Sequence, residues 1–463
     1  MKRKIISILL AVSMILSLAA CGSSASDSSG AGGTSDTAGK SSASDSKNSD
    51  AASSKASGGD KTVINYYTWE SNEDTNPIID QFMADNPDIE VVLHVIADTT
   101  DAQTQLDIMA MGGSEIDVMQ IADGQQFAKA KSGILLSLDD YITADNVDME
   151  ADYGSYADWA RYDGKYYCLP RHTSVGCVFY NKTMFDELGL SYPKDDWTYA
   201  EYETTARAAT QGEGSGKVYG TFNHIRPGFW CLFALQKTGF YTEDGMSNIG
   251  DKLFRQDLEN RKKLDDDGIQ KSYNEIVASG TLQNNEFFNE HCAMVMAASW
   301  MVRDMKNKEA YPYDFEVGVA DFPRLDEDTP LKSTWGSVSA LGIPTSSDHP
   351  DEAWKFIRYY LEKGSVNIAK NGNVPCYLPS YGDDLVKAFI EGSGLSLEDG
   401  QKFFSEDITA VAKMPIGEAM VEYNTIMNDQ TSLYLGGAQD LDTTIDNMVT
   451  QTNDAIETER AGN

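Results

Sequence analysis

Basic residues are scarce in this sequence. It contains 37 lysines and arginines against 72 aspartates and glutamates, which gives a formal charge of −35. At this balance no basic face is available to hold nucleic acid, and an anionic membrane surface would repel the chain. We therefore expect no nucleic-acid partner, and we interpret the acidity as a means of keeping the protein soluble.

Cysteine and histidine are also rare. The 463 residues include six cysteines and five histidines, and no C-x-x-C pair occurs. A zinc site, a disulfide framework and a metal-binding receptor are therefore poorly supported, and we expect neither a metal nor a cofactor. Apart from Cys21, we interpret the cysteines as buried free thiols that act as small hydrophobes. They are Cys168, Cys177, Cys231, Cys292 and Cys376. A disulfide between the first two, which are the closest pair in sequence, is the alternative.

The N-terminus has the pattern of a secretory signal. Residues 2–4 are basic, an apolar run broken by serines follows, and Leu-Ala-Ala then meets Cys21. The run is shorter than the roughly 20 apolar residues that a membrane span needs. The junction resembles the lipobox of bacterial lipoproteins, which implies cleavage after residue 20 and lipidation (palmitate) of Cys21. Two or more acyl chains would anchor the protein stably; an ordinary cleaved signal with a chance cysteine is the alternative.

Large apolar and aromatic residues are absent from 22–60, which consists of Ser, Ala, Gly, Asp, Thr, Lys and Asn. Such a segment cannot bury enough apolar area to offset the entropy of ordering it, so we predict a disordered tether. Its mean reach is about 35 Å. Loss of the three basic leader residues would take the formal charge from −35 to −38.

The remaining chain alternates strand and helix patterns. We predict strands at 63–67, 89–96 and 115–121, and helices starting near Pro77 and at Gln103, the second being stopped by Gly112 and Gly113. This alternation predicts a parallel α/β sheet with helices on both faces, and about 400 residues imply two lobes. Ligands of such sheets bind beyond the carboxyl ends of the strands, where Trp69, Glu70 and Asp123 lie.

The stretch 163–190 organises the centre of the chain. Asp163-Gly164 predicts a turn, and an extended segment follows that includes Arg171 and His172. Val175, Cys177 and Phe179 alternate with small or polar residues, which predicts a strand. A break at Asn181 and a short helix that ends at Gly189 complete the unit.

Several motifs in this order are similar to one family. The central stretch follows its Gly-x-x-Tyr-x-Leu-Pro…Tyr-Asn-Lys-x-x-Phe-x-x-x-Gly-Leu…Trp pattern at 164–197. Further matches are Trp69-Glu70, Asn86-Pro87-Asp88, Ile116-Asp117-Val118, the segment 287–294 and Trp335-Gly336. A predicted helix at 351–361 comes next, with Pro350 near its start and Gly364 after its end. The chain from residue 61 resembles the extracellular solute-binding proteins of bacterial ABC importers, in the maltose-binding-protein-like family for sugars and oligosaccharides. Cys292 departs from the small residue that is usual there.

The resemblance implies an α/β, two-lobed periplasmic-binding-protein-like fold of type II, each lobe a sheet flanked by helices, joined by hinge crossings. Lobe 1 would comprise 61–172 and 337–375, and lobe 2 would comprise 173–336 and 376–463. The crossings would lie near 171–175, 337–342 and 374–378. It further implies a monomer on the extracellular face of a Gram-positive type of membrane. This monomer would be held only by its anchor, would bind a sugar or oligosaccharide, and would deliver it to ABC permease subunits without catalysis.

A sugar site needs flat aromatic surfaces and polar groups that satisfy hydroxyls. The candidate ligand-binding residues are Trp69, Glu70, Asp123, Arg171, His172, Trp230, Trp300 and Trp335. For each tryptophan the alternative is a place in the core. For Trp197 and Trp354 we favour the core or the surface over the ligand site, while Trp159 stays open. For the two carboxylates the alternative is a helix N-cap, and for Arg171 it is an ion pair at the hinge.

Two other functions remain open. A lipid-anchored secreted glycosidase would need two carboxylates at a set separation, which the sequence does not exclude. No nucleophile elbow, H-E-x-x-H or phosphate loop is present to support an enzyme. A sensor that presents a bound sugar to a signalling receptor would have the same sequence features as an importer protein.

Overall fold

The structure is a computed structural model, and it describes residues 61–97, 99–226 and 228–462. The predicted leader, the lipidation site Cys21 and the predicted tether at 22–60 therefore lie outside the described residues. Among those residues, no helix is both long enough and apolar enough to cross a membrane.

The strands form one mixed sheet and one separate hairpin. The order in the sheet is β2-β1-β3-β10-β6-β8-β7, with β11 and β9 paired to β6 and β12 paired to β10. The strands are Thr62–Thr68 (β1), Ile89–Val95 (β2), Val118–Ile121 (β3), Arg161–Tyr162 (β4), Lys165–Tyr166 (β5), Leu169–Asn181 (β6), Tyr219–Phe222 (β7), Cys292–Ala298 (β8), Val317–Asp321 (β9), Ser333–Gly342 (β10), Val374–Pro375 (β11) and Thr409–Ala412 (β12). β1 runs parallel to β2 and β3, as predicted, but β10 is antiparallel to β3 and β6. The predicted parallel arrangement of these first strands is therefore confirmed, and the sheet as a whole is mixed because β10 returns to it from a distant part of the chain.

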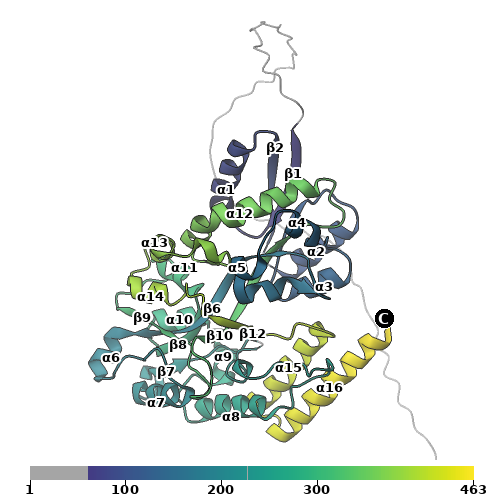
Figure 1. Ribbon diagram of the computed structural model, residues 1–463. Coiled ribbons are helices and arrows are strands. Elements are labelled where there is room, and N and C mark those ends of the chain that lie inside the picture. Colours follow the sequence, from purple (N-terminus) through teal and green to yellow (C-terminus); the bar gives the residue numbers. More distant parts are fainter. Residues whose placement is uncertain (1–60, 98, 227, 463) are drawn as a thin grey trace, which may run out of the picture. The chain divides into compact units, whose positions relative to one another are not determined.

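Helices lie around this sheet (Figure 1). They are Asn72–Asp85 (α1), Thr100–Met111 (α2), Gln125–Lys131 (α3), Asp139–Ala144 (α4), Met149–Tyr153 (α5), Lys182–Leu188 (α6), Tyr199–Ala209 (α7), Lys252–Asp266 (α8), Tyr273–Ser279 (α9), Gln283–Phe288 (α10), Met301–Lys306 (α11), Pro350–Lys370 (α12), Asp383–Ile390 (α13), Leu397–Gln401 (α14), Met420–Leu435 (α15) and Leu441–Gly462 (α16). α15 and α16, drawn in yellow, lie side by side.

β6 belongs to two sets of strands. Its first part, Leu169 to Val175, pairs with β10 and β11, and its second part, Gly176 to Asn181, pairs with β8 and β9. β10 also has two neighbourhoods, because its start pairs with β12 and its end pairs with β3. These two long strands therefore connect the β1–β3 half of the sheet to the β7–β9 half.

Gly176 sits where β6 changes partners, and the Trp335 ring lies against it. A Cβ atom on Gly176 would be 2.4 Å from Trp335 Nε1 and 2.6 Å from two ring carbons. Trp335 is only 1% exposed. The close approach of strand and ring therefore requires glycine at this position.

The central stretch folds as the sequence predicts. Asp163 and Gly164 have φ of 47° and 76° and connect β4 to β5. Asn181 caps α6 by accepting the Met184 N–H at 2.9 Å, and Gly189 ends α6 with φ of 65°. Local turn and cap chemistry is therefore sufficient to specify this unit.

Three predicted helix boundaries were wrong, and the smallest error is at α2, which begins at Thr100 rather than at Gln103. α1 begins five residues before Pro77, because Ser71 caps it by accepting the Asp74 N–H. The proline lies inside the helix, where it lacks the N–H for one intrahelical bond. α12 continues through Gly364, where a Cβ would be 2.3 Å from Ile78 Cδ1. This glycine permits close packing of α12 on α1 rather than ending the helix.

The core confirms the predicted apolar faces. Tyr66 of β1 and Phe82 of α1 both contact Phe356 of α12, at ring distances of 5.4 and 5.1 Å. The five cysteines of the described chain are buried and free, so the predicted thiols are confirmed. Trp197 and Trp354 are 2% and 5% exposed, so of the two places favoured from the sequence, core or surface, both occupy the core.

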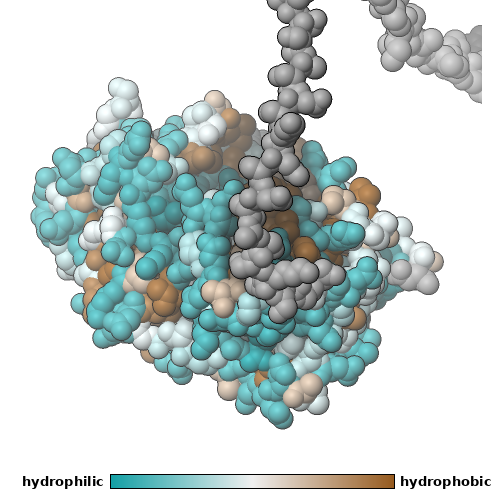
Figure 2. Space-filling view, turned by 90° about the horizontal axis from the view of Figure 1, so that it is seen from above, coloured by the Kyte–Doolittle hydropathy of each residue, from teal (hydrophilic) through white to brown (hydrophobic). Residues whose placement is uncertain are grey.

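The surface is largely hydrophilic. Figure 2 shows hydrophilic residues over most of the coloured part of one face, with apolar residues in smaller patches between them. This agrees with the formal charge of −35. The apolar residues are thus gathered mainly in the core.

We expect Gly176→Ala to lower the free energy of unfolding by about 1–3 kcal/mol, because the new Cβ displaces the Trp335 ring in a packed site. Urea denaturation followed by tryptophan fluorescence measures the change. Gly239→Ala is the matched control, since Gly239 is exposed and a Cβ there meets no atom within 4 Å. Equal effects of the two substitutions would contradict this account of the strand crossing.

Candidate functional site

Segments that follow the strands of both halves of the sheet converge on β6 and β10. Residues 69–70 follow β1, and Asp123 follows β3. Asp123 Oδ1 accepts the N–H of Val338 in β10 at 3.3 Å. Ser299, which follows β8, accepts the N–H of Val175 in β6 at 3.1 Å through its Oγ. The two connecting strands therefore bring the carboxyl ends of β3 and β8 into one neighbourhood.

Arg171 lies in a β-bulge of β6. Its two neighbours in β6 pair with adjacent residues of β10, so Arg171 has no residue opposite. A bulge turns the side chain of the extra residue away from the regular alternation. Arg171 is 2% exposed, and its Nη1 donates to Glu70 Oε1 at 2.8 Å. The bulge thus directs a cation into the interior, where it meets the carboxylate that follows β1.

A hydrogen-bonded network surrounds this ion pair. The Gln120 amide donates to Glu70 Oε1 at 3.3 Å and to Ser339 Oγ at 2.8 Å. Arg171 Nη2 donates to the Tyr360 hydroxyl at 3.2 Å. Residues from β1, β3, β6, β10 and α12 are therefore joined at one point. The ion pair matches the alternative considered for Arg171, and the ligand role of both charged residues stays a prediction.

The network sets the charge states of its members. Burial alone would raise the pKa of Glu70, but Arg171, His172 and the hydrogen bond from Gln120 outweigh it and hold the pKa at about 2. Burial and the neighbouring Arg171 lower the pKa of His172 to about 3. Arg171 Nη1 lies 2.6 Å from His172 Nδ1, and because a guanidinium can only donate, this nitrogen must accept. His172 is therefore neutral at physiological pH.

Asp123 faces a lysine from a distant segment. Lys413 Nζ lies 3.6 Å from Asp123 Oδ2 and 5.4 Å from the centre of the Trp335 ring. Burial raises the pKa of Asp123, while Lys413 and the Val338 N–H act in the opposite direction. Asp123 does not cap α3, whose N-cap is Gly124 with φ of 77°. The carboxylate is held beside β10 with one cation and one backbone donor.

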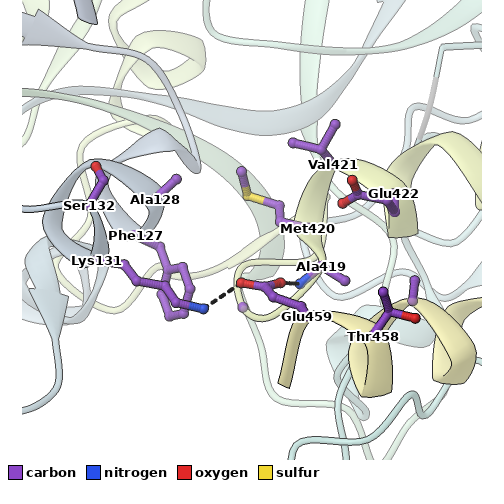
Figure 3. A pocket seen from close by; sticks show the side chains of 12 residues that line it. Phe127, Ala128, Lys131, Ser132, Ala419, Met420, Val421, Glu422, Thr458 and Glu459 are labelled. Carbon is purple, nitrogen blue, oxygen red and sulfur yellow. Dashed lines mark hydrogen bonds and ion pairs between the residues drawn. The ribbon is translucent and has the colours of Figure 1, made fainter. Parts of the chain in front are cut away.

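A groove of about 670 Å³ opens between α3 on one side and α15 and α16 on the other (Figure 3). Gly124, the residue after Asp123, adjoins this groove, since a Cβ there would lie 3.7 Å from Met420 Sδ. The lining residues are Phe127, Ala128, Lys131, Ser132, Gly417, Ala419, Met420, Val421, Glu422, Ala455, Thr458 and Glu459. The walls thus combine apolar side chains with charged and hydroxyl groups, which suits a ligand that has both apolar and polar surfaces.

The four candidate tryptophans fall into two groups. Trp69 and Trp300 are half-buried and follow β1 and β8. Trp230 and Trp335 are 6% and 1% exposed and pack among core side chains. Trp159, left open from the sequence, is 9% exposed. In this conformation only the first group has ring surface that is accessible from outside the core.

Sequence reasoning missed several residues of this region. Gln120 donates a hydrogen bond to Glu70, and Lys413 forms an ion pair with Asp123. Phe127 and Met420 line the groove. Phe127 could have been found, because it lies on the first turns of the helix that follows Asp123. Lys413 and Met420 are about 290 residues away along the chain, and no local motif marks them. Among the described residues, no group of three or more His, Cys, Asp or Glu side chains is arranged to hold a metal ion.

Comparison with known proteins identifies the family of the chain. The family model for the bacterial extracellular solute-binding protein matches residues 68–367. The chain belongs to this family of bacterial extracellular solute-binding proteins. A multiple sugar-binding protein of Streptococcus mutans is 26% identical over 323 residues, which cover 65% of this chain and 71% of the relative.

Solved structures of solute-binding proteins share the fold. A sugar transporter from Rhizobium etli, in an open conformation, has a TM-score of 0.75 at 22% identity and covers 84% of this chain and 99% of its own. An ABC substrate-binding protein from Listeria monocytogenes, in complex with cycloalternan, has a TM-score of 0.71 at 22% identity, with 86% and 100% covered. The sugar-binding protein MalE from Xanthomonas citri has a TM-score of 0.70 at 22% identity, with 86% and 98% covered. The two-lobed α/β fold expected from the sequence is therefore confirmed, and the family consists of binding proteins.

We expect His172 to lower the stability of the protein as the pH falls from 7 to 5, and His172→Asn to remove this contribution. The unfolded chain protonates His172 near pH 6.5, whereas the folded protein resists protonation down to about 3. Stability from this residue is therefore present above pH 6.5 and declines below it, by on the order of 1–2 kcal/mol at pH 5. Asn keeps an acceptor for Arg171 and does not titrate. Urea denaturation at several pH values measures the slope.

His224 provides an internal control for this measurement. Burial lowers its pKa as well, to about 4, and it is unchanged in the variant. The difference between the two proteins therefore isolates His172. Identical pH slopes would show that His172 titrates normally in the folded state.

Proposed function

We propose that this protein captures a sugar or oligosaccharide between two closing lobes and delivers it to the permease subunits of an ABC transporter. The observation that carries the proposal is the groove of about 670 Å³ beside Asp123, lined by aromatic, methionine, hydroxyl and charged side chains. Its size lies within the roughly 300–1,000 Å³ that is typical of small-molecule sites. The relative named for binding multiple sugars and the neighbour described in complex with cycloalternan support a carbohydrate as the ligand.

The two lobes are proposed to be 61–172 with 337–375, and 173–336 with 376–463. The change of partners along β6 and β10 supports these limits, because β6 switches at Gly176 and β10 between its start and its end. Val374 and Pro375 in β11 pair with the first part of β6, which supports a third crossing just after them. Rotation at these strands would move the α3 wall of the groove relative to the α15 and α16 wall.

Trp69 and Trp300 are the residues proposed to stack on sugar rings. Both are half-buried and follow strands of opposite halves of the sheet, so one ring could contact each side of a guest. Asp123 is proposed to accept sugar hydroxyls. Glu70, Arg171 and His172 shape the base of the site through their network, and Trp230 and Trp335 support it from the core.

Binding of a ligand to both lobes favours the closed form, because that form makes more contacts with the ligand. The closed form is then the one that a permease recognises. This process needs no bond cleavage and no cofactor, and we propose that the protein is not an enzyme. A monomer is sufficient for it.

We expect a neutral sugar or oligosaccharide to raise the melting temperature, and amino acids, peptides and divalent metals to leave it unchanged, since a ligand that binds only the native state stabilises it. Trp69→Ala and Trp300→Ala should each abolish most of this shift, because loss of a stacked ring costs about 0.5–1.5 kcal/mol beyond the buried area. A thermal-shift screen followed by calorimetry measures both effects.

Tyr192→Ala is the control for these variants, because Tyr192 is an aromatic residue with 42% exposure on α6's neighbouring loop. A melting-temperature shift with peptides alone would overturn the carbohydrate as the ligand class.

Chromatography of the recovered ligand distinguishes a binding protein from a glycosidase. Intact carbohydrate agrees with a binding protein, and cleaved carbohydrate would establish the glycosidase instead. Deletion of the gene distinguishes import from sensing. Loss of both uptake of the carbohydrate and growth on it supports import.

A lipid anchor at Cys21 is also proposed, on the strength of the Leu-Ala-Ala-Cys junction after a basic and apolar leader. We expect Cys21→Ser to release the protein from membranes into the soluble fraction, because no acyl chains would be attached. Cell fractionation with immunoblotting measures the distribution. Ser23→Ala controls for the change of sequence near the cleavage point, and retention of the Cys21→Ser protein on membranes would exclude the anchor.

A further inference from the structure

The last turn of α16 reaches the groove and contacts both of its walls. Glu459 accepts a hydrogen bond from Lys131 Nζ, at the end of α3, and another from the backbone N–H of Ala419 (Figure 3). Lys131 and Glu459 have side-chain exposures of 27% and 33%. One carboxylate therefore touches both walls of the groove.

Ala419 needs this partner for a local reason. It is the N-cap of α15, it has φ of 53°, and it makes no side-chain cap of its own. The first N–H groups of a helix require acceptors, and a carboxylate near them also interacts favourably with the helix dipole. Glu459 supplies that acceptor from another helix. It thereby fixes the backbone immediately before Met420, whose side chain lines the groove.

The same segment is held from one side by further contacts. Arg460 Nε donates to Glu418 Oε2 at 2.5 Å, and the Tyr241 hydroxyl donates to Glu418 O at 2.8 Å. The Tyr241 ring also lies against Gly417, where a Cβ would be 2.8 Å from it. Residues 417–419 are thus fixed to α16 and Tyr241 independently of α3. Lys131 is the contact that joins α3 to this assembly.

We propose that Lys131 and Glu459 form a latch between the two lobes at the groove, and that Glu459 is a positioning residue for the ligand-contacting segment before α15. This inference rests on the proposed function, because a latch matters only if the lobes move. When the latch forms, the closed form is more populated before ligand arrives. Apparent affinity rises in proportion to that population.

The electrostatics of the pair agree with this role. The hydrogen bond from Lys131, with the Ala419 N–H, lowers the pKa of Glu459 against the opposing effect of burial, and the same bond raises the pKa of Lys131. Both groups are therefore charged across the physiological range. Because they are partly exposed, added salt should weaken the pair.

The cleanest test is Lys131→Met, which removes the bond between the lobes and leaves the Glu459–Ala419 bond in place. We expect it to weaken carbohydrate binding roughly two- to fivefold, the range of a partly exposed ion pair, with an unchanged melting temperature of the ligand-free protein. Affinity of the parent protein should fall as NaCl rises from about 20 to 500 mM, and affinity of Lys131→Met should vary less. Lys387→Met, which removes an exposed lysine from α13, is the control. Affinity and salt dependence equal to those of the parent protein would overturn the latch.

Charge reversal tests the positioning role and the pair together. Lys131→Glu should repel Glu459, weaken binding further and raise the radius of gyration of the ligand-free protein in X-ray scattering. Adding Glu459→Lys should restore the radius of gyration but not the full affinity, because lysine cannot accept the Ala419 N–H. Glu457→Gln, on the exposed side of the same helix turn, should change nothing. Full restoration of affinity by the double variant would overturn the positioning role.

The two proposals fail in different ways. If the parent protein binds no carbohydrate, the proposed function fails. X-ray scattering of the ligand-free proteins then tests the latch by itself, and an unchanged radius of gyration in Lys131→Glu would overturn the latch. If the parent protein binds carbohydrate and the variants match it, only the latch fails.

Discussion

The buried ion pair between Glu70 and Arg171 ties the segment after β1 to the first part of β6, and the hydrogen-bonded network around it depends on this pair. A charge in the interior is tolerated only when it is paired and hydrogen-bonded, so this pair requires Gln120 and Tyr360 around it. Those partners come from β3 and α12. The pair therefore holds β3, β6, α12 and the segment after β1 together, near the point at which β6 changes its partner strands.

The bulge at Arg171 is what makes the pair possible. In regular alternation β6 would direct successive side chains to opposite faces of the sheet. The extra residue breaks that alternation and turns the guanidinium toward Glu70, while the strand continues to Gly176 and its second set of partners. The buried ion pair is thus a consequence of one irregularity in a long strand.

The groove and the buried network are built differently. The network around Glu70 and Arg171 is buried, whereas the walls of the groove are helices joined by a partly exposed pair, Lys131 and Glu459. Buried hydrogen-bonded networks are rigid, and exposed ion pairs are weak and open readily. This contrast agrees with the proposed function, in which the hinge stays intact while the walls separate to admit and release a ligand.

The sequence predicted the elements whose signals are local. The hairpin at Asp163-Gly164, the cap at Asn181, the stop at Gly189 and the apolar face of α1 all follow from turn chemistry or side-chain period. Family resemblance added the two-lobed fold. The start of α1 was misjudged because Ser71 is a stronger signal than Pro77, and Gly364 was misjudged because glycine also permits close helix packing.

By itself, the sequence determined the α/β class, the acidic surface, the buried thiols and the strand ends at which Glu70 and Asp123 stand. Only the tertiary structure decided which residues meet there. Gln120, Lys413 and Met420 come to the site from separate parts of the chain, and Trp230 and Trp335 are buried although their local context resembles that of Trp69. The physical reason is that burial and pairing depend on contacts between residues far apart in sequence, which local patterns do not record.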